Sequence, residues 1–240
     1  MRTLVQSIVS IALTLSFSVL GAEPSKKAPN VLTASEKAAG WKLLFDGRTT
    51  DGWRAIGKKE IPAKGWVVAD GWLKHEAYGG GGDIVTKDEF RNFELTFEWK
   101  VAPGANSGVK YLISDARGPV GHEYQVIDDA THADAHRGGK WQTGALYDLI
   151  APKEGKKLFP AGEINQGKIL VKGKHVEHWL NGEKLLECEL ESDEMIALIA
   201  KSKFKNAPQF GVKAPTLILL QDHGDETWFR NLKIRELAGD

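Results

Sequence analysis

Two polar side chains in residues 122–128 (HEYQVID) could bind and deprotonate a sugar. Successive side chains of a strand point to opposite faces, so Tyr124 and Val126 share one face while Glu123 and Gln125 share the other. A carboxylate beside an amide can bind sugar hydroxyls, and the carboxylate can also act as a general base. A solvated outer face of a sheet would give the same pattern, so spacing alone leaves both interpretations open.

The loop that follows offers ligands for a metal ion. Asp128, Asp129, His132, Asp134 and His136 supply carboxylate oxygens and imidazole nitrogens within a short segment. No zinc motif of the H-E-x-x-H type is present, and alanines separate the ligands. Spacing alone therefore favours a polar rim of an active site over a metal site, and His132 and Asp134 are the metal candidates.

Polar residues of the same kind recur in later segments. His178 lies in HVEHWLNG on the strand face opposite Trp179, where a lone histidine is more often packed than catalytic. Gln221 and His223 share a face at the end of the apolar run LILLQDH, and Arg230 follows as a candidate clamp for a hydroxyl or carboxylate. Polar pairs on several strands beside tryptophans are typical of a carbohydrate-binding groove.

Strands must position these side chains. Short runs rich in aromatic and β-branched residues alternate with Asp-Gly, Lys-Gly and Asn-Gly turns. In NFELTFEWKV, the residues Phe93, Leu95, Phe97 and Trp99 fall on one face and polar residues on the other. This alternation predicts an all-β sandwich of two antiparallel sheets, and the only convincing helical pattern lies near residues 192–200.

The chain reads as one globular unit behind a leader. Residues 1–22 have a basic start, an apolar run and small residues at the end, which predicts a secretory signal peptide, with an uncleaved anchor as the alternative. Residues 23–39 are polar and contain proline, as in a linker, and residues 40–238 form the single domain. We therefore expect a periplasmic or extracellular protein with no stable membrane insertion after signal cleavage.

Charge and motifs argue against several classes of function. The formal net charge is +0, with 32 basic and 32 acidic residues mixed along the chain, so no basic field attracts nucleic acid. The sequence contains no phosphate-binding loop, G-x-S-x-G elbow or Rossmann fingerprint, and we expect no organic cofactor. The single cysteine, Cys188, cannot form an intramolecular disulfide.

A series of segments resembles the 3-keto-disaccharide hydrolase family, long labelled a domain of unknown function. The matching segments are GWKLLFDGRTTDGW, GWVVADGWL, NFELTFEWKVAPGANSGVKYLI, HEYQVIDDATHADA, TGALYDL, VEHWLNG, AKSKFK and LLQDHGDETWFRNLKIREL. They occur in the family's order and span residues 40–237. The resemblance implies the concanavalin A-like jelly roll, two antiparallel sheets with a concave groove.

The resemblance also implies a reaction, namely the cleavage of glycosides already oxidised at C3 of the sugar. A ketone at C3 acidifies the hydrogen on C2, so a base can remove it, the C1 substituent can leave, and water can then add. This route needs a base, an oxyanion stabiliser that could be a divalent metal ion or a cation, and an acid for the leaving oxygen.

Site residues can be carried over by position. Those that match the family's motifs are Glu123, Gln125, Asp128, His132, Asp134, His178, Lys203, Gln221 and His223. To these we add Asn106 and Tyr147 from matched segments, and Arg230, as substrate-binding candidates. The family's subgroup has proline where this chain has Ala133, which loosens the loop. Our hypothesis for the catalytic set is Glu123, His178 and His223, with the identity of the base left open.

Two other functions compete with a hydrolase or lyase acting on 3-keto-glycosides. A carbohydrate-binding module without catalysis is the alternative, because the same jelly roll serves both roles. An ordinary glycoside hydrolase is disfavoured, because no strand carries the closely spaced acids of the E-x-D-x-x-E kind.

Overall fold

The protein is a sandwich of two antiparallel β-sheets, as the strand pattern predicts. The computed structural model describes residues 28–239, so the expected signal peptide lies outside the described residues. Sheet A has eight strands, with β1 (Lys42–Leu43) paired to β13. Its other strands run in the order β11 (Glu183–Glu189), β10 (His175–Leu180), β9 (Asn165–Lys172), β6 (Phe93–Val101), β13 (Thr227–Glu236), β4 (Trp72–His75) and β3 (Trp66–Ala69).

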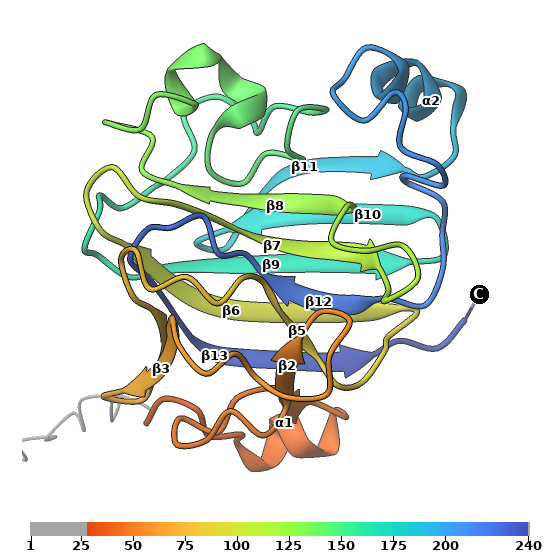
Figure 1. The fold of residues 1–240 in the computed structure, drawn as a ribbon. Coiled ribbons are helices and arrows are strands. Elements are labelled where there is room, and N and C mark those ends of the chain that lie inside the picture. Colours follow the sequence, from red (N-terminus) through yellow and green to blue (C-terminus); the bar gives the residue numbers. More distant parts are fainter. Residues whose placement is uncertain (1–27, 240) are drawn as a thin grey trace, which may run out of the picture.

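Sheet B is smaller and lies across the core from sheet A (Figure 1). Its five strands run in the order β2 (Trp53–Ala55), β5 (Ile84–Thr86), β12 (Leu217–Leu220), β7 (Asn106–Ile113) and β8 (His122–Ile127). Within residues 28–239, every pair of neighbouring strands is antiparallel in both sheets. This arrangement is the jelly-roll architecture, and the predicted fold class is confirmed.

Aromatic rings fill the space between the sheets. Phe93 and Phe97 of β6 are buried, as the alternation in that segment predicts. The ring centroids of Phe93 and Tyr111 are 6.4 Å apart, and those of Phe97 and Tyr124 are 5.3 Å apart. These edge-on contacts join β6 of sheet A to β7 and β8 of sheet B. The face of β8 that carries Tyr124 therefore points inward, which leaves Glu123 on the outer face of sheet B.

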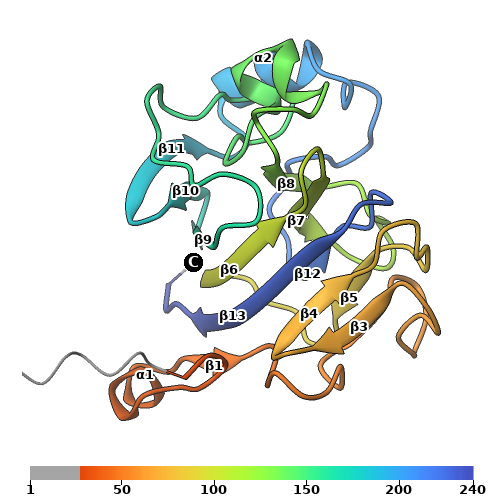
Figure 2. The same cartoon turned by 90° about the vertical axis from the view of Figure 1, so that its left-hand side faces the viewer.

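Helices are short and lie at the two ends of the sandwich (Figures 1 and 2). Helix α2 (Asp193–Ala200) begins after Ser192, whose side chain accepts a hydrogen bond from Met195 N, as the sequence predicts. The 3₁₀ turns η1 (Ala135–Arg137) and η2 (Gly139–Trp141) lie at the same end as α2, and α1 (Ala34–Ala38) lies at the opposite end. Among residues 28–239, no helix is long and apolar enough to cross a membrane.

The described part of the expected linker is attached to the sandwich. Asn30 is buried, its backbone N–H donates to Asn231 Oδ1 at 2.6 Å, and its side chain donates to Gly71 O at 2.8 Å. Helix α1 (Ala34–Ala38) follows, and its capping box pairs Thr33 with Glu36. Sequence inspection missed this helix, because it is only five residues long and buries none of its side chains.

Candidate functional site

The outer face of sheet B carries a carboxylate between cations. Strand register pairs Glu123 of β8 with Lys110 of β7, so both side chains project from the same face. Lys110 Nζ lies 3.7 Å from Glu123 Oε2, and only 6% of Glu123 is exposed. The prediction that Glu123 and Gln125 share the face opposite Tyr124 and Val126 is confirmed.

Gly108 makes room for this carboxylate. It lies opposite Gln125 in the register, and a Cβ placed on it would come within 2.5 Å of Glu123 Oε1. Gln125 fixes the same oxygen, because its amide, oriented with the NH₂ group toward β7, donates to Glu123 Oε1 at 3.0 Å and to Ser107 O at 3.0 Å. The carboxylate is therefore held in one place by the glycine beneath it and the amide beside it.

A segment after η2 covers one side of Glu123. Gly144 N donates to Gln125 O at 2.9 Å and Tyr147 N donates to Glu123 O at 3.1 Å, so this segment extends sheet B beyond β8. Tyr147 is nearly buried beside Glu123, and Lys203 Nζ lies 4.1 Å from the centroid of its ring. The structure thus brings the predicted residues Tyr147 and Lys203 to the predicted carboxylate.

Burial sets the electrostatics of Glu123. Removal from water raises the pKa of Glu123 above its usual value, and the positive charges of Lys110 and Lys203 offset part of this rise. Burial lowers the pKa of Lys203, an effect that the nearby Glu123 opposes. Such opposed shifts bring a carboxylate and an ammonium group closer to the pH range in which proton transfer is efficient.

Two histidines and an aspartate lie on the Gln125 side of Glu123. His132, His223 and Asp225 each offer one ligand atom, and these atoms lie within 4.8 Å of one another. Gln221 N donates to Gly108 O, and Gly108 lies against the Glu123 side chain, so the segment that carries His223 starts beside Glu123 on sheet B. Glu123 and His223 thus belong to the same sheet, as the predicted convergence requires.

His132, His223 and Asp225 have the donor types that bind a divalent cation. Two imidazoles and one carboxylate are a common ligand set for a catalytic metal, with further positions left for substrate or water. Asp225 is oriented by the N–H of Asn106, which donates to its Oδ2 at 2.9 Å. Nδ1 of His132 accepts from Asp134 N at 3.0 Å, so neutral His132 carries its proton on Nε2. The set fits a metal, and ligation through Nε2 of His132 would require that hydrogen bond to break.

Asp134 and Asp128 hold the loop together in this structure. Asp134 accepts hydrogen bonds from Arg137 at 2.8 Å and from the hydroxyl of Tyr147 at 3.1 Å, and it is not a member of the three-donor group. Asp128 accepts from Gly104 N at 2.8 Å and from the hydroxyl of Thr131. Of the predicted metal candidates, His132 thus lies in a group of close donor atoms with His223 and Asp225, whereas Asp134 lies outside that group.

Gln221 lines the same region. Its backbone N–H donates to Gly108 O at 3.0 Å, which places the residue beside β7. Its side-chain Oε1 is buried and has no hydrogen-bond partner among the described residues. A buried acceptor without a partner is costly, so this oxygen is an uncompensated polar atom beside β7.

His178 lies in the sealed interior, away from the other predicted catalytic residues. It projects inward from β10, it is 0% exposed, and burial lowers its pKa to about 4. Its Nδ1 donates to Gly144 O at 3.1 Å, and its Nε2 accepts from the Tyr111 hydroxyl at 2.8 Å. Strands β7 and β8 separate it from the outer face of sheet B. The expectation that His178 shares a ligand with Glu123 and His223 is not met, because its strand presents this side chain to the core.

Arg230 is also elsewhere, on the outer face of sheet A. Its Nε donates to Glu98 Oε2 at 2.7 Å, and its guanidinium lies 4.3 Å from the ring centroid of Trp72. The two sheets separate these groups from Glu123. The clamp expected at Arg230 therefore does not reach the site on sheet B.

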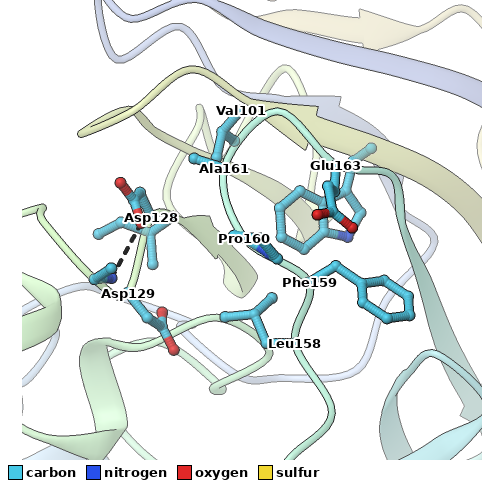
Figure 3. Close-up of a pocket in the computed structure, with 11 residues that line it drawn as sticks. Val101, Asp128, Asp129, Leu158, Phe159, Pro160, Ala161 and Glu163 are labelled. Atoms are coloured by element: carbon cyan, nitrogen blue, oxygen red, sulfur yellow. Dashed lines mark hydrogen bonds between the residues drawn. The ribbon is translucent and has the colours of Figure 1, made fainter.

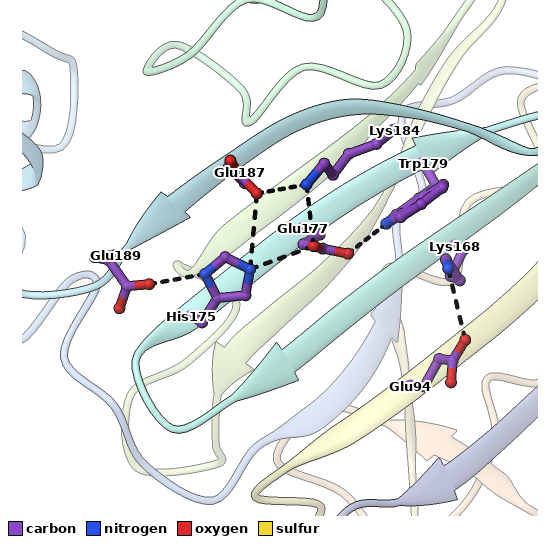
Figure 4. Close-up of polar contacts among 8 residues, drawn as sticks. All are labelled: Glu94, Lys168, His175, Glu177, Trp179, Lys184, Glu187 and Glu189. Carbon is purple, nitrogen blue, oxygen red and sulfur yellow. Dashed lines mark hydrogen bonds and ion pairs between the residues drawn. The ribbon is translucent and has the colours of Figure 1, made fainter.

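A second histidine–carboxylate group lies on that face of sheet A (Figure 4). His175 Nδ1 contacts Glu189 at 2.7 Å, and Nε2 contacts Glu177 at 3.3 Å. The hydrogen bond that His175 Nδ1 donates to the Glu189 carboxylate is the largest cause of the raised pKa of His175. Lys184 pairs with Glu187 at 2.6 Å, so these carboxylates already have cations beside them and we place no metal there.

A cavity of about 320 Å³ lies beside Asp128, between the sandwich and the segment that holds Leu158 and Phe159 (Figure 3). Its lining is mostly apolar, and its described charged residues are all acidic. It therefore lacks a cation to hold developing negative charge, and we do not place the chemistry in it.

Sequence inspection missed Lys110, Asp83 and Asp225. Asp83 accepts a hydrogen bond from Asp222 N at 2.9 Å, next to Gln221 and His223, and its charge raises the pKa of Glu123. Lys110 is the one charged residue in the strand NSGVKYLI, a signal that could have marked it. Asp225 follows His223 by two residues, but only the fold brings the pair to His132.

The chain resembles known proteins over most of its length. A family model of the 3-keto-α-glucoside-1,2-lyase-like domain matches residues 40–235. A 3-keto-disaccharide hydrolase of Bacteroides thetaiotaomicron is 35% identical, over 97% of this chain and 89% of that protein.

Two crystal structures from Parabacteroides distasonis, each provisionally named a glycosyl hydrolase, are similar in fold. One has a TM-score of 0.79 at 34% identity and covers 88% of this chain and 100% of that chain. The other has a TM-score of 0.59 at 28% identity and covers 82% of this chain and 99% of that chain.

Proposed function

Because this chain belongs to the family of 3-keto-α-glucoside-1,2-lyase-like domains, we propose that it is a secreted hydrolase that cleaves glycosides carrying a ketone at C3. The observation that carries the proposal is the buried carboxylate of Glu123, held between Lys110 and Lys203 on the outer face of sheet B. A basic carboxylate beside two ammonium groups suits the removal of a proton that a neighbouring ketone has acidified.

Glu123 is the base in this proposal. Its carboxylate takes the proton from C2, and the electrons of the C–H bond form a C2–C3 double bond as negative charge moves to the C3 oxygen. Lys110 lies 3.7 Å from the carboxylate, so its positive charge can stabilise the enolate that forms beside it. Gln125 keeps the carboxylate oriented throughout, because its amide donates to Oε1.

Lys203 is the acid. As the enolate re-forms the ketone, its electrons make a C1–C2 double bond and the C1–O bond breaks. The departing oxygen takes a proton from the ammonium of Lys203, whose lowered pKa makes it a better donor than an ordinary lysine.

Water completes the reaction. It adds its oxygen to C1 and gives a proton to the neutral amine of Lys203, while Glu123 returns its proton to C2. Both side chains regain their starting states, and the net change is hydrolysis of the C1–O bond.

His132, His223 and Asp225 are proposed to hold a divalent cation. A bound cation would act as a Lewis acid toward an oxygen of the oxidised ring.

The test is Glu123→Gln, assayed with a 3-keto-glucoside and compared with Glu98→Gln, which removes a partly buried, ion-paired carboxylate from the other sheet. We expect Glu123→Gln to lose about 10²–10⁴-fold in kcat, because a general base contributes that much, and Glu98→Gln to retain turnover. Turnover that survives in Glu123→Gln would rule this residue out as the base. A wild-type protein that binds 3-keto-sugars without cleaving them would refute the hydrolase proposal itself.

A further inference from the structure

A pocket of about 390 Å³ opens on the side of Glu123 away from the histidines. Lys110, Glu123 and Lys203 form its inner end. The remaining lining residues are Pro119, Val120, Gly121, Phe204, Asn206 and Ala207. The pocket thus begins at the proposed acid and base and continues over a different set of side chains.

Strand register places this pocket and the histidine group on opposite sides of Glu123. Gly108 lies across from Gln125, and Gln221 N donates to Gly108 O, so the Gln221 and His223 region lies beyond Gln125. Gly121 precedes the start of β8 and so lies beyond Glu123 in the other direction. An oxidised ring held between Glu123 and the histidines would therefore direct its leaving group past Lys203 into the pocket.

The outer wall of the pocket is poor in hydrogen-bonding side chains. Val120 is 45% exposed, and Phe204 is fixed by stacking on Phe210 with ring centroids 4.1 Å apart and an interplanar angle of 10°. Asn206 is the only polar side chain among the lining residues beyond the three charged groups. A second sugar ring would bring several hydroxyls, and each one left unpaired on burial would weaken binding.

We propose that this pocket receives an apolar aglycone, an alcohol bearing an aromatic or alicyclic ring, in place of a second sugar. The inference rests on the proposed function, because it assigns the leaving-group side of the same reaction. Lys203 stands at the boundary between the two halves, where the oxygen that joins the aglycone to C1 would lie. The apolar wall would then exclude water from the aglycone while the charged end acts on the sugar.

The experiment compares three 3-keto-glucosides, with methyl, benzyl and glucosyl groups at C1. Methanol and benzyl alcohol are alcohols of similar acidity, so the difference between these two compounds reports on the pocket, whereas a glucosyl group is the better leaving group of the three. We expect kcat/KM for the benzyl compound to exceed that for the methyl compound by roughly 30- to 100-fold, from the apolar area of one ring at about 25 cal/mol per Å², and to exceed that for the disaccharide as well.

Val120→Asn tests the wall, and Ile196→Asn is the matched control, because Ile196 is also an exposed aliphatic residue (57%) but lies on α2 outside the pocket. We expect Val120→Asn to lower the benzyl-to-methyl ratio of kcat/KM about tenfold, within the range for altered apolar contacts. Ile196→Asn should change neither rate. A disaccharide preferred over the benzyl compound would overturn the inference while leaving the hydrolase intact.

A binding measurement separates the two failures. The methyl resonances of Val120 should shift on titration with benzyl alcohol and not with glucose, whether or not any substrate is cleaved. If no 3-keto-glycoside is turned over but this selective shift appears, the proposed function fails and the apolar pocket stands. If turnover occurs and glucose shifts the resonances as strongly as benzyl alcohol does, the pocket assignment fails alone.

Discussion

Gly108→Ala should displace the proposed base without disturbing the fold. The added Cβ would lie 2.5 Å from Glu123 Oε1, 2.8 Å from Cδ and 2.9 Å from Cγ, whereas ordinary van der Waals contact begins at 3.4 Å. The carboxylate must therefore move by about 1 Å, and a misplacement of about 1 Å can cost about 10²-fold in rate. We expect kcat/KM to fall about 100-fold, equivalent to about 2.7 kcal/mol of transition-state stabilisation.

The stability of this variant should change little. Gly108 does not adopt a left-handed backbone conformation, and the atoms that the new methyl meets belong to a side chain that can rotate. Replacing glycine with alanine at such a position changes the free energy of unfolding by about 1 kcal/mol or less. Urea unfolding would measure the change in the free energy of unfolding, and initial rates with a 3-keto-glucoside would measure the change in kcat/KM.

A double-mutant cycle shows whether the loss passes through Glu123. In a Glu123→Gln background the base is already absent, so adding Gly108→Ala should have almost no further effect on kcat. The reasoning would be refuted by a Gly108→Ala variant with kcat/KM within about threefold of the wild-type value, since the predicted factor is about 100. A loss of equal size in both backgrounds would refute it as well.

Three further results are expected. In a plot of kcat/KM against pH, the acid limb should lie above the usual pKa range of a glutamate, because burial raises the pKa of Glu123 and the base works deprotonated. Lys110→Met should move that limb to still higher pH, because the charge of Lys110 lowers the pKa of Glu123. A limb that does not move in this variant would contradict the assignment of Glu123 as the base. Folded His122 and His178 have pKa values lowered by burial to about 3 and about 4, so below about pH 6.5 the unfolded chain binds protons that the folded chain does not. The free energy of unfolding should then fall by up to about 1.4 kcal/mol per pH unit for each histidine as pH drops, and urea unfolding between about pH 7 and about pH 5 that shows no decrease would refute this. Chelator should remove turnover, and His132→Ala should lower the bound metal measured by elemental analysis; one equivalent of metal retained in that variant would contradict the proposed ligand set.

Much of the fold could be predicted from the alternation of apolar and polar residues along each strand. In β6 and β8 it assigned each side chain to the correct face, because a strand buried on one side leaves a period of two in the sequence. It therefore placed Glu123 and Gln125 together and opposite Tyr124, as the structure has them. The predicted helix at α2 rested on a capping serine, another signal that depends only on neighbouring residues.

The alternation of side chains along a strand does not tell which of its two faces points into the core, and for β10 this led to a wrong prediction. For β10 it placed His178 opposite Trp179, and the structure turns the histidine inward while the larger ring faces out. Val176 and Leu180 are buried on either side of His178, and Trp179 is covered instead by Lys168, whose Nζ lies 3.7 Å from the ring centroid. Tryptophan is usually expected on the buried face of a strand, but a lysine that covers its ring allows it to lie on the outer face.

Assignment of strands to sheets was the other missing information. Arg230 follows His223 closely in the chain, but its strand belongs to sheet A whereas the Glu123 cluster belongs to sheet B. Lys110 and Glu123 meet through cross-strand register, which no local pattern reports. Long-range pairing thus decided which polar residues form the site.

The segment from Gly144 to Tyr147 has a consequence for solubility. This segment hydrogen-bonds to β8, the edge strand of sheet B. Without it, the unpaired backbone N–H and C=O groups of β8 could pair with a strand of another chain. The loop that helps to build the reaction centre is therefore also a guard against self-association. Selection for new substrates cannot freely remodel this loop, because a looser version would tend to aggregate before any gain in catalysis could be expressed.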